Sequence, residues 1–295
     1  MSRRMLSPFV TAAFIVALAK VSSGAIQKNN SDFDNIGTRD INKGTVNFVS
    51  LDNEVAMGRQ TAAEVERTWP IVTDSTISEY VNRVGQTVVR NSDAKVFQFT
   101  IRVIDSDELN AFALPGGFLF VNSGLILSTD DESELASIMA HQIAHVAARD
   151  STEYFSSQQG FSLTPFLTGW TPFSTVQFSE EMEEEADYLG VQYLYKSGYD
   201  PNAMVRLLQR LQLKERSERR STFFPIHPLT GGGSSNVEKA IESILPTTQR
   251  YVENKSEFDR IKALLVLGDR RPAADNPEIA PAQGEPPTLK RKRIN

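Results

Sequence analysis

The sequence around His141 and His145 constrains this chain more than any other feature. The two histidines stand four residues apart in an apolar stretch that begins at Asp131 and ends near Arg149. Asp131 and Glu134 have the pattern of a helix capping box, so the stretch is predicted to be a helix. Residues four apart share a helix face, and two imidazoles placed this way can point at one metal ion. The spacing alone is equally compatible with a histidine pair in the core or at the surface without a metal.

A second candidate element is the acidic run at residues 180–187. Glu183 and Asp187 share a helix face, so one carboxylate could bind a metal while the other accepts a hydrogen bond from a liganding histidine. Spacing alone does not choose Glu183 over Glu184 or Glu185. A solvent-exposed acidic helix face is the alternative interpretation of the run.

Composition excludes several other classes of protein. The chain has no cysteine, which excludes disulfides, thiolate metal sites, a cysteine nucleophile and a lipid-anchored cysteine at the N-terminus. Histidine chemistry is confined to His141, His145 and His227, because the chain contains 3 histidines. The net charge of −6 argues against binding to nucleic acid, which requires a basic face for phosphates.

The N-terminus has the pattern of an export signal. Arg3 and Arg4 precede a short apolar run, and small residues at 23–25 provide a cleavage site, so residues 1–25 are predicted to be a signal peptide. An N-terminus that stays uncleaved would instead associate the chain with a membrane. The predicted location is the periplasm or cell envelope, with the chain soluble or peripherally membrane-associated.

The remainder is predicted to form one domain at residues 51–268. An irregular segment at 26–50 precedes it, and a disordered, proline-rich tail with a basic end follows at 269–295. Residues 151–178 have no clear periodicity and are expected to be irregular.

Hydrophobic periodicity predicts a mainly α-helical α+β domain with a small sheet. Strands are expected at 96–104, where apolar and polar residues alternate, and at 118–121, after two glycines. Besides the helix at 131–149, helices are expected at residues 51–68, 75–90, 179–197, 200–215, 237–244 and 256–266.

Several motifs occur in an order that is specific to one family of peptidases. They are Leu109–Gly117, Glu134–Ala136, Glu183–Gly190, Gly198–Pro201 and His227–Pro228, in addition to the two-histidine helix. With them the chain resembles the gluzincin family of zinc metalloendopeptidases that includes the CaaX prenyl proteases, HtpX and the periplasmic peptidase BepA. The resemblance covers about residues 51–245.

The resemblance implies a zincin-like metallopeptidase fold with an active-site helix and one zinc ion per chain. It implies His141, His145 and Glu183 as zinc ligands, with Asp187 orienting a ligand histidine. It also implies that 118–121 is an edge strand to which an extended peptide adds as a further strand. The residues assigned to substrate binding are Asn110, Ala111, Phe112, Ala113, Gly116, Gly117, Phe118, Leu119 and Phe120.

Gln142 departs from the family pattern, in which a glutamate follows the first histidine. That glutamate accepts a proton from the metal-bound water, which a neutral amide cannot do, and losing a general base costs about 10²–10⁴ in rate. Asp150, at a position where relatives often carry a histidine, would lie roughly 12 Å beyond Gln142 on a continuing helix, too far to replace it. The arginine that usually follows His227–Pro228 is absent, and His227 is assigned as oxyanion stabiliser or gating ligand.

The sequence therefore predicts an exported zinc-dependent metalloendopeptidase that hydrolyses peptide bonds of envelope proteins at a rate reduced by Gln142. Its expected partners are extended or misfolded polypeptides. The alternative is a zinc-bound pseudopeptidase that binds polypeptides as a chaperone-like envelope protein without cutting them.

Overall fold

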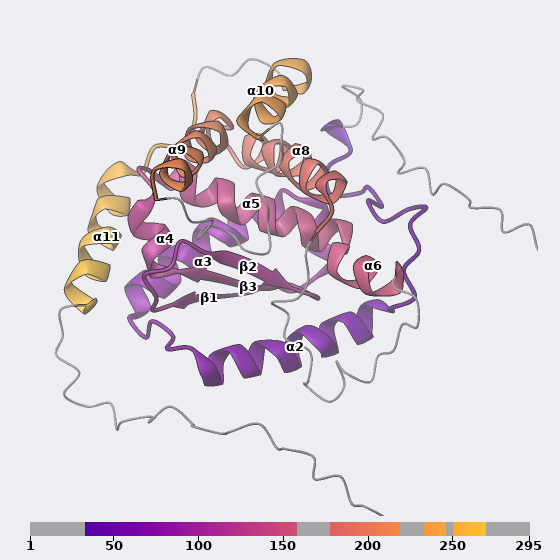
Figure 1. Ribbon diagram of the computed structural model, residues 1–295, viewed down its shortest axis with the longest axis horizontal. Coiled ribbons are helices and arrows are strands. Elements are labelled where there is room, and N and C mark those ends of the chain that lie inside the picture. Colours follow the sequence, from indigo (N-terminus) through magenta and orange to yellow (C-terminus); the bar gives the residue numbers. More distant parts are fainter. Residues whose placement is uncertain (1–32, 158–177, 219–232, 246–249, 270–295) are drawn as a thin grey trace, which may run out of the picture.

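The computed structural model describes residues 33–157, 178–218, 233–245 and 250–269 (Figure 1). The predicted signal peptide, the tail beyond residue 269 and His227 lie outside these ranges. The described part is mainly helical with one small sheet, which confirms the predicted α+β class. None of the helices within it has both the length and the apolar composition that crossing a membrane requires.

The first two helices begin where side chains satisfy their free N–H groups. Helix α2 spans Leu51–Thr68, and the hydroxyl of Ser50 caps it by accepting a hydrogen bond from the backbone of Asn53. Helix α3 spans Ser75–Arg90, and the carboxylate of Asp74 caps it in the same way. Both ranges agree with the prediction from hydrophobic periodicity.

The sheet contains strands β1 (Thr100–Ile104), β2 (Ala111–Leu114) and β3 (Phe118–Asn122). Their order is β1-β3-β2, with β1 parallel and β2 antiparallel to β3. The turn between β2 and β3 contains Gly116, whose φ is +74°, and a Cβ at this position would lie 2.5 Å from the Cα of Val55 in α2. The turn thus requires glycine for its backbone conformation and for its close contact with α2.

The prediction that 118–121 is an edge strand is wrong. Strand β3 lies in the centre of the sheet, and its residues Phe118, Leu119 and Phe120 pair with β1 on one side and β2 on the other. A peptide cannot add to a strand whose backbone is already paired on both sides. The edge beside β3 is formed by β2, which the hydrophobic pattern did not reveal.

The two faces of the sheet are covered by different helices (Figure 1). Leu119 and Val121 point into the main core, which α3 and α5 (Glu132–Ala148) complete. Phe120 alternates with them and packs on the opposite face against Ala62 of α2. The period of two along β3 therefore places α5 on one side of the sheet and α2 on the other.

Three further elements differ from the prediction. Residues 96–104 were expected to be one strand, but a 3₁₀ helix, η1 (Asp93–Val96), precedes the shorter β1. The short helix α4 (Ser123–Ser128) was not predicted. Residues 151–178 were expected to be irregular, whereas α6 spans Asp150–Ser157. The remaining helices are α8 (Glu180–Lys196), α9 (Asn202–Glu218), α10 (Gly233–Ile244) and α11 (Lys255–Asp269).

Residues 33–50 contain mostly turns and pack against the helices. Arg39 forms a buried ion pair with Asp93, with 2.6 Å between guanidinium Nη2 and carboxylate Oδ2. The same carboxylate oxygen accepts a hydrogen bond of 2.9 Å from the hydroxyl of Tyr193 in α8. These contacts fasten the N-terminal segment to η1 and α8.

Candidate metal centre

His141 and His145 lie on one face of α5, as expected for residues four apart. Their Nε2 atoms are 3.1 Å apart and their ring planes are inclined by 81°. The side chain of His145 is 3% exposed and that of His141 is 15% exposed. Because the surrounding residues of α5 are buried in the core, the helix holds both rings in fixed positions.

Glu183 meets the two histidines from α8, which packs alongside α5. Its Oε2 lies 3.3 Å from Nε2 of His141, and its Oε1 lies 3.8 Å from Nε2 of His145. Gly190 permits this approach, because a Cβ there would lie only 3.2 Å from the backbone nitrogen of His141. The ligand atoms of the three residues lie within 4.8 Å of one another, so the group could hold a metal ion.

The neighbouring glutamates on α8 point elsewhere. Glu184 accepts a hydrogen bond of 2.9 Å from the amide of Asn236 in α10. Glu185 is half-buried, and burial, together with the charge of Glu153, raises its pKa to about 7. Spacing in the sequence did not distinguish Glu183 from Glu184 and Glu185. In the structure, Glu183 is the one that lies beside the histidines.

Each histidine is held by an aspartate at its other ring nitrogen. Nδ1 of His141 lies 2.9 Å from Oδ1 of Asp187, the residue expected to orient a histidine. Nδ1 of His145 lies 2.6 Å from Oδ2 of Asp150. With both Nδ1 atoms engaged by carboxylates, the two Nε2 atoms are directed towards each other and towards Glu183.

The cluster favours a positive charge. Burial lowers the pKa of His141, but hydrogen bonds and charges from Asp187 and Glu183 outweigh it and raise the pKa to about 10. The two Nε2 atoms, 3.1 Å apart, are close enough to share a proton or to bind one cation together. A bound cation between the Nε2 atoms and Glu183 would be favoured by the same carboxylates.

Gln142 is fixed against the edge of the sheet. It is 1% exposed, and its Oε1 accepts a hydrogen bond of 3.1 Å from the backbone N–H of Ala113 in β2. Ala111 and Phe112, also assigned to substrate binding, lie in the same strand, and Asn110 precedes it. The buried Oδ1 of Asn110 has no hydrogen-bond partner among the residues that the structure describes. Gly116 and Gly117 lie in the following turn.

Sequence reasoning assigned no role to two residues that contact His145. The prediction placed Asp150 far from the site because it assumed that the helix continues, but α5 ends at Ala148 and the chain turns back. Phe178 stacks on the His145 ring, with 4.3 Å between centroids and 13° between planes. Phe178 packs in an apolar cluster with Phe112, Tyr154, Phe155 and Met182. No local pattern marks Phe178, whereas the acidic residue five positions after His145 was a usable signal.

Comparison with known proteins gives relatives of one kind. The chain is 29% identical over 240 residues to the beta-barrel assembly-enhancing protease of Escherichia coli K12, covering 73% of this chain and 48% of the relative. The corresponding protein of Yersinia pestis is 30% identical over 222 residues, covering 67% and 46%. The mitochondrial metalloendopeptidase OMA1 of Schizosaccharomyces pombe is 31% identical over 227 residues, covering 70% and 66%.

The chain spans about half the length of the bacterial relatives that it matches. The family described as Peptidase family M48 matches residues 76–232, just over half of the chain. This match includes the two-histidine helix, Gln142, Glu183 and Asp187. The motifs, the fold and the convergence of α5 and α8 agree with it, and the chain belongs to the M48 family of metallopeptidases.

Proposed function

We propose that the chain is an exported zinc metalloendopeptidase by descent, which hydrolyses peptide bonds of envelope proteins at a rate reduced by Gln142. The observation that carries this proposal is the convergence of His141, His145 and Glu183, with Gln142 on the same helix. The sequence of residues 1–25 supports export. The relatives' name, beta-barrel assembly-enhancing protease, supports substrates in the envelope.

The donor atoms fit zinc. Zinc in proteins binds histidine nitrogen and carboxylate oxygen, and a tetrahedral ion with bonds of about 2.0–2.1 Å separates its ligands by roughly 3.3 Å. The separations among Nε2 of His141, Nε2 of His145 and the nearer oxygen of Glu183 to each are 3.1, 3.3 and 3.8 Å. Bound zinc would lower the pKa of a water molecule to about 7 and so supply a nucleophile.

The contact between Gln142 and Ala113 explains why the amide is a poor substitute for a glutamate. An N–H group needs an acceptor, so the oxygen of Gln142 must face Ala113. The remaining polar group of the side chain is then the NH₂, which can donate hydrogen bonds but cannot accept a proton. A carboxylate in this position would keep one oxygen for Ala113 and retain a second oxygen as a base.

We propose that polypeptides bind along β2 rather than β3. Alternate residues of an antiparallel strand turn their N–H and C=O groups to opposite sides. Ala113 donates away from β3, to Gln142, and Ala111 turns its backbone groups to the same side, where it is fully buried. An extended peptide that pairs with β2 would use the carbonyl of Ala113, and it would reach Ala111 only where the residues that cover Ala111 are displaced.

The alternative is a zinc-bound pseudopeptidase that binds extended or misfolded polypeptides. The hydrogen bond from Ala113 to Gln142 favours it, because that bond uses the oxygen of Gln142 and leaves only donors. A purely structural envelope protein would not need His141, His145 and Glu183 as metal ligands. Zinc analysis therefore distinguishes it from the peptidase and from the pseudopeptidase.

The deciding experiment compares wild type, Gln142→Glu and Gln142→Ala for zinc content and for hydrolysis of casein. We expect about one zinc per chain in all three, because the ligands are unchanged. Gln142→Glu should hydrolyse casein at least about 10²-fold faster than wild type, and a chelator should abolish the gain. Zinc-loaded Gln142→Glu that stays inert would favour the pseudopeptidase. Wild type without zinc would refute the proposal.

A further inference from the structure

The turn that follows α5 carries an unusual backbone conformation. Arg149 has φ 60° and ψ 32°, and it is the one residue other than glycine with a positive φ in the described ranges. The left-handed conformation costs a residue with a Cβ about 1–2 kcal/mol. The turn begins α6 immediately at Asp150 instead of continuing α5.

The turn places the carboxylate of Asp150 beneath His145. The Oδ2 to Nδ1 distance is 2.6 Å, and the two side chains are 2% and 3% exposed. A continuing α5 would have carried residue 150 away along the helix axis. The observed contact between residues only five apart therefore depends on the conformation of Arg149.

The side chain of Arg149 holds the turn in place. Its Nε lies 2.6 Å from Oε2 of Glu54 in α2, and its Nη2 donates to the backbone carbonyl of Val49. The carboxylate of Glu54 is 1% exposed and also accepts a hydrogen bond from Thr152 of α6. The buried pair thus links the end of α5, the start of α6 and the start of α2.

The two histidines have the same kinds of polar neighbours, although His145 and Asp150 are the more buried pair and Phe178 stacks on His145. His141 has Asp187 at Nδ1 and Glu183 near Nε2, while His145 has Asp150 at Nδ1 and Glu183 near Nε2. A carboxylate at Nδ1 fixes the tautomer and orientation of a metal-binding histidine and raises its basicity. Asp150 occupies for the second histidine the place that Asp187 occupies for the first.

We infer that Asp150 is a positioning residue for the metal, which sets the orientation and tautomer of His145 through the turn at Arg149. The inference rests on the proposed function, since it requires that His145 binds a metal ion. Asp150 touches neither the ion nor a substrate and acts through His145 alone. The site accordingly has two such aspartates rather than the one that the sequence indicated.

The test measures zinc affinity by chelator competition in wild type, Asp150→Asn and Asp150→Ala, each as the full chain. Asp150→Ala should weaken zinc binding about 10–100-fold, the usual effect of losing an outer partner. Asp150→Asn should weaken it less, because the amide oxygen still accepts from Nδ1. Asp187→Asn serves as the comparator, and Asp259→Asn, which changes an exposed residue of α11, should bind zinc like wild type.

A second measurement works without metal. In the zinc-free wild type, ¹⁵N-detected NMR should show the His145 proton on Nδ1, and Asp150→Ala should redistribute it between the ring nitrogens.

Cobalt substitution should give a visible spectrum that differs in Asp150→Ala. A merely structural Asp150 would lower the melting temperature without moving the affinity, tautomer or spectrum.

The outcomes test the role of Asp150 separately from the proposed metal site. If wild type binds zinc and folded Asp150→Ala binds it within about threefold, the role of Asp150 is refuted while the proposed metal site stands. If wild type binds no zinc, both are refuted. If Asp150→Ala does not fold, Asp150→Asn decides: a zinc affinity and a His145 tautomer that are both unchanged from wild type would overturn the inference.

Discussion

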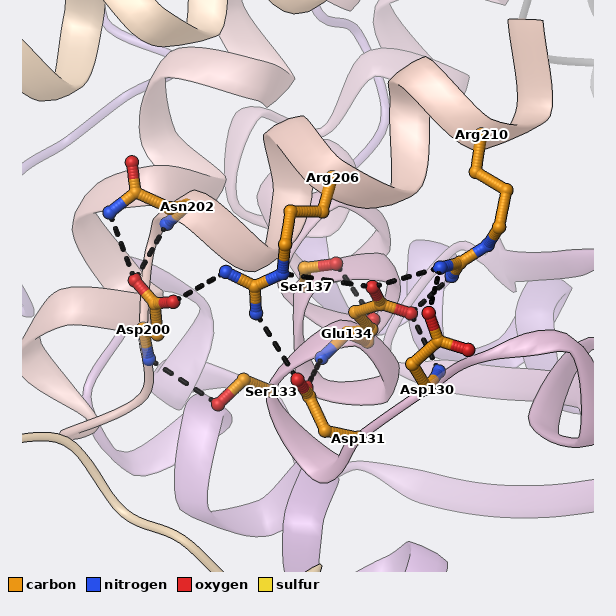
Figure 2. A network of polar contacts seen from close by, with 9 residues as sticks. All are labelled: Asp130, Asp131, Ser133, Glu134, Ser137, Asp200, Asn202, Arg206 and Arg210. Carbon is orange, nitrogen blue, oxygen red and sulfur yellow. Dashed lines mark hydrogen bonds and ion pairs between the residues drawn. The ribbon is translucent and has the colours of Figure 1, made fainter. Parts of the chain in front are cut away.

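The two ends of α5 handle buried carboxylates in different ways. At the N-terminal end, Glu134 is 1% exposed and forms ion pairs with Arg206 and Arg210 of α9 (Figure 2). Asp130 and Asp131 join the same network. At the C-terminal end, carboxylates from α8 and from the turn after α5 surround two histidines instead. At the N-terminal end the carboxylates pair with arginines, which stay charged. At the C-terminal end they contact histidines, which can lose a proton and could then bind a metal.

This difference separates stability from function along one helix. Arginine remains charged throughout the physiological pH range, so the network at Glu134 is suited to fastening α9 to α5. Histidine can be a neutral ligand or a cation, so the other end can accept a metal without a change in fold. Substitutions at the first end should therefore alter unfolding alone, and substitutions at the second end should also alter metal binding.

The largest effect is expected for His141→Ala. Removing one of three proposed ligands should weaken zinc binding by more than the roughly 10²-fold that losing an outer partner costs. Zinc per chain after gel filtration should fall to near zero, and the metal-free variant should unfold at a lower denaturant concentration than wild type, because Asp187 and Glu183 lose their cationic partner. Full zinc occupancy in His141→Ala would show that the metal binds elsewhere.

The next largest effect is expected for Glu134→Gln, which should leave zinc binding intact. The change removes the partner of two arginines, and we expect a loss of about 2 kcal/mol in unfolding free energy. Breaking a fully buried pair costs about 3–5 kcal/mol, but Arg206 and Arg210 are 44% and 35% exposed. Urea denaturation measures the change. Glu257→Gln, which removes an exposed pair with Arg83, is the matched control and should cost less than about 1 kcal/mol.

The sequence predicted much of this arrangement because local signals marked it. The helices at 51–68 and 75–90 have capping residues and regular apolar spacing, and the histidine pair needs only one helix to share a face. Sheet order is a long-range property, so nothing local indicated that 118–121 would be central. The four residues of β2 are too few to show a period. The acidic residue five positions after His145 was visible in the sequence, but its contact with His145 depends on the left-handed conformation of Arg149, which residue type does not indicate.

A smaller effect, dependent on pH, is expected for Glu54→Gln in the metal-free protein. Burial raises the pKa of Glu54, and the charge and hydrogen bond of Arg149 only partly oppose it. The protonated form is therefore favoured by folding: its contribution is fully present below the ordinary pKa of 4.5 and is lost as pH rises through the raised value.

Glutamine mimics the protonated glutamate, so the variant should lose this pH dependence. The amide oxygen can still accept from Arg149, so Glu54→Gln should have nearly the unfolding free energy of wild type at acidic pH and should become more stable than wild type as pH rises to 7. Urea unfolding across the range measures both. A deficit that grows with pH would mean that the ionised pair stabilises the turn.

The smallest effect is expected for Phe178→Leu, which tests whether packing also distinguishes the two ends of α5. Phe178 is 5% exposed and stacks on His145. Leucine retains most of the buried apolar surface but loses the ring stacking, which is worth about 0.5–1.5 kcal/mol. The unfolding free energy should fall by about 1 kcal/mol. Because stacking is not an interaction between charges, this loss should be the same at about 0.1 M and 1 M salt, whereas the loss in Glu134→Gln should shrink at high salt as screening weakens the exposed arginine contacts. Equal salt dependence in the two variants would contradict the inference that exposed charge pairs stabilise the N-terminal end of α5 and apolar packing the C-terminal end.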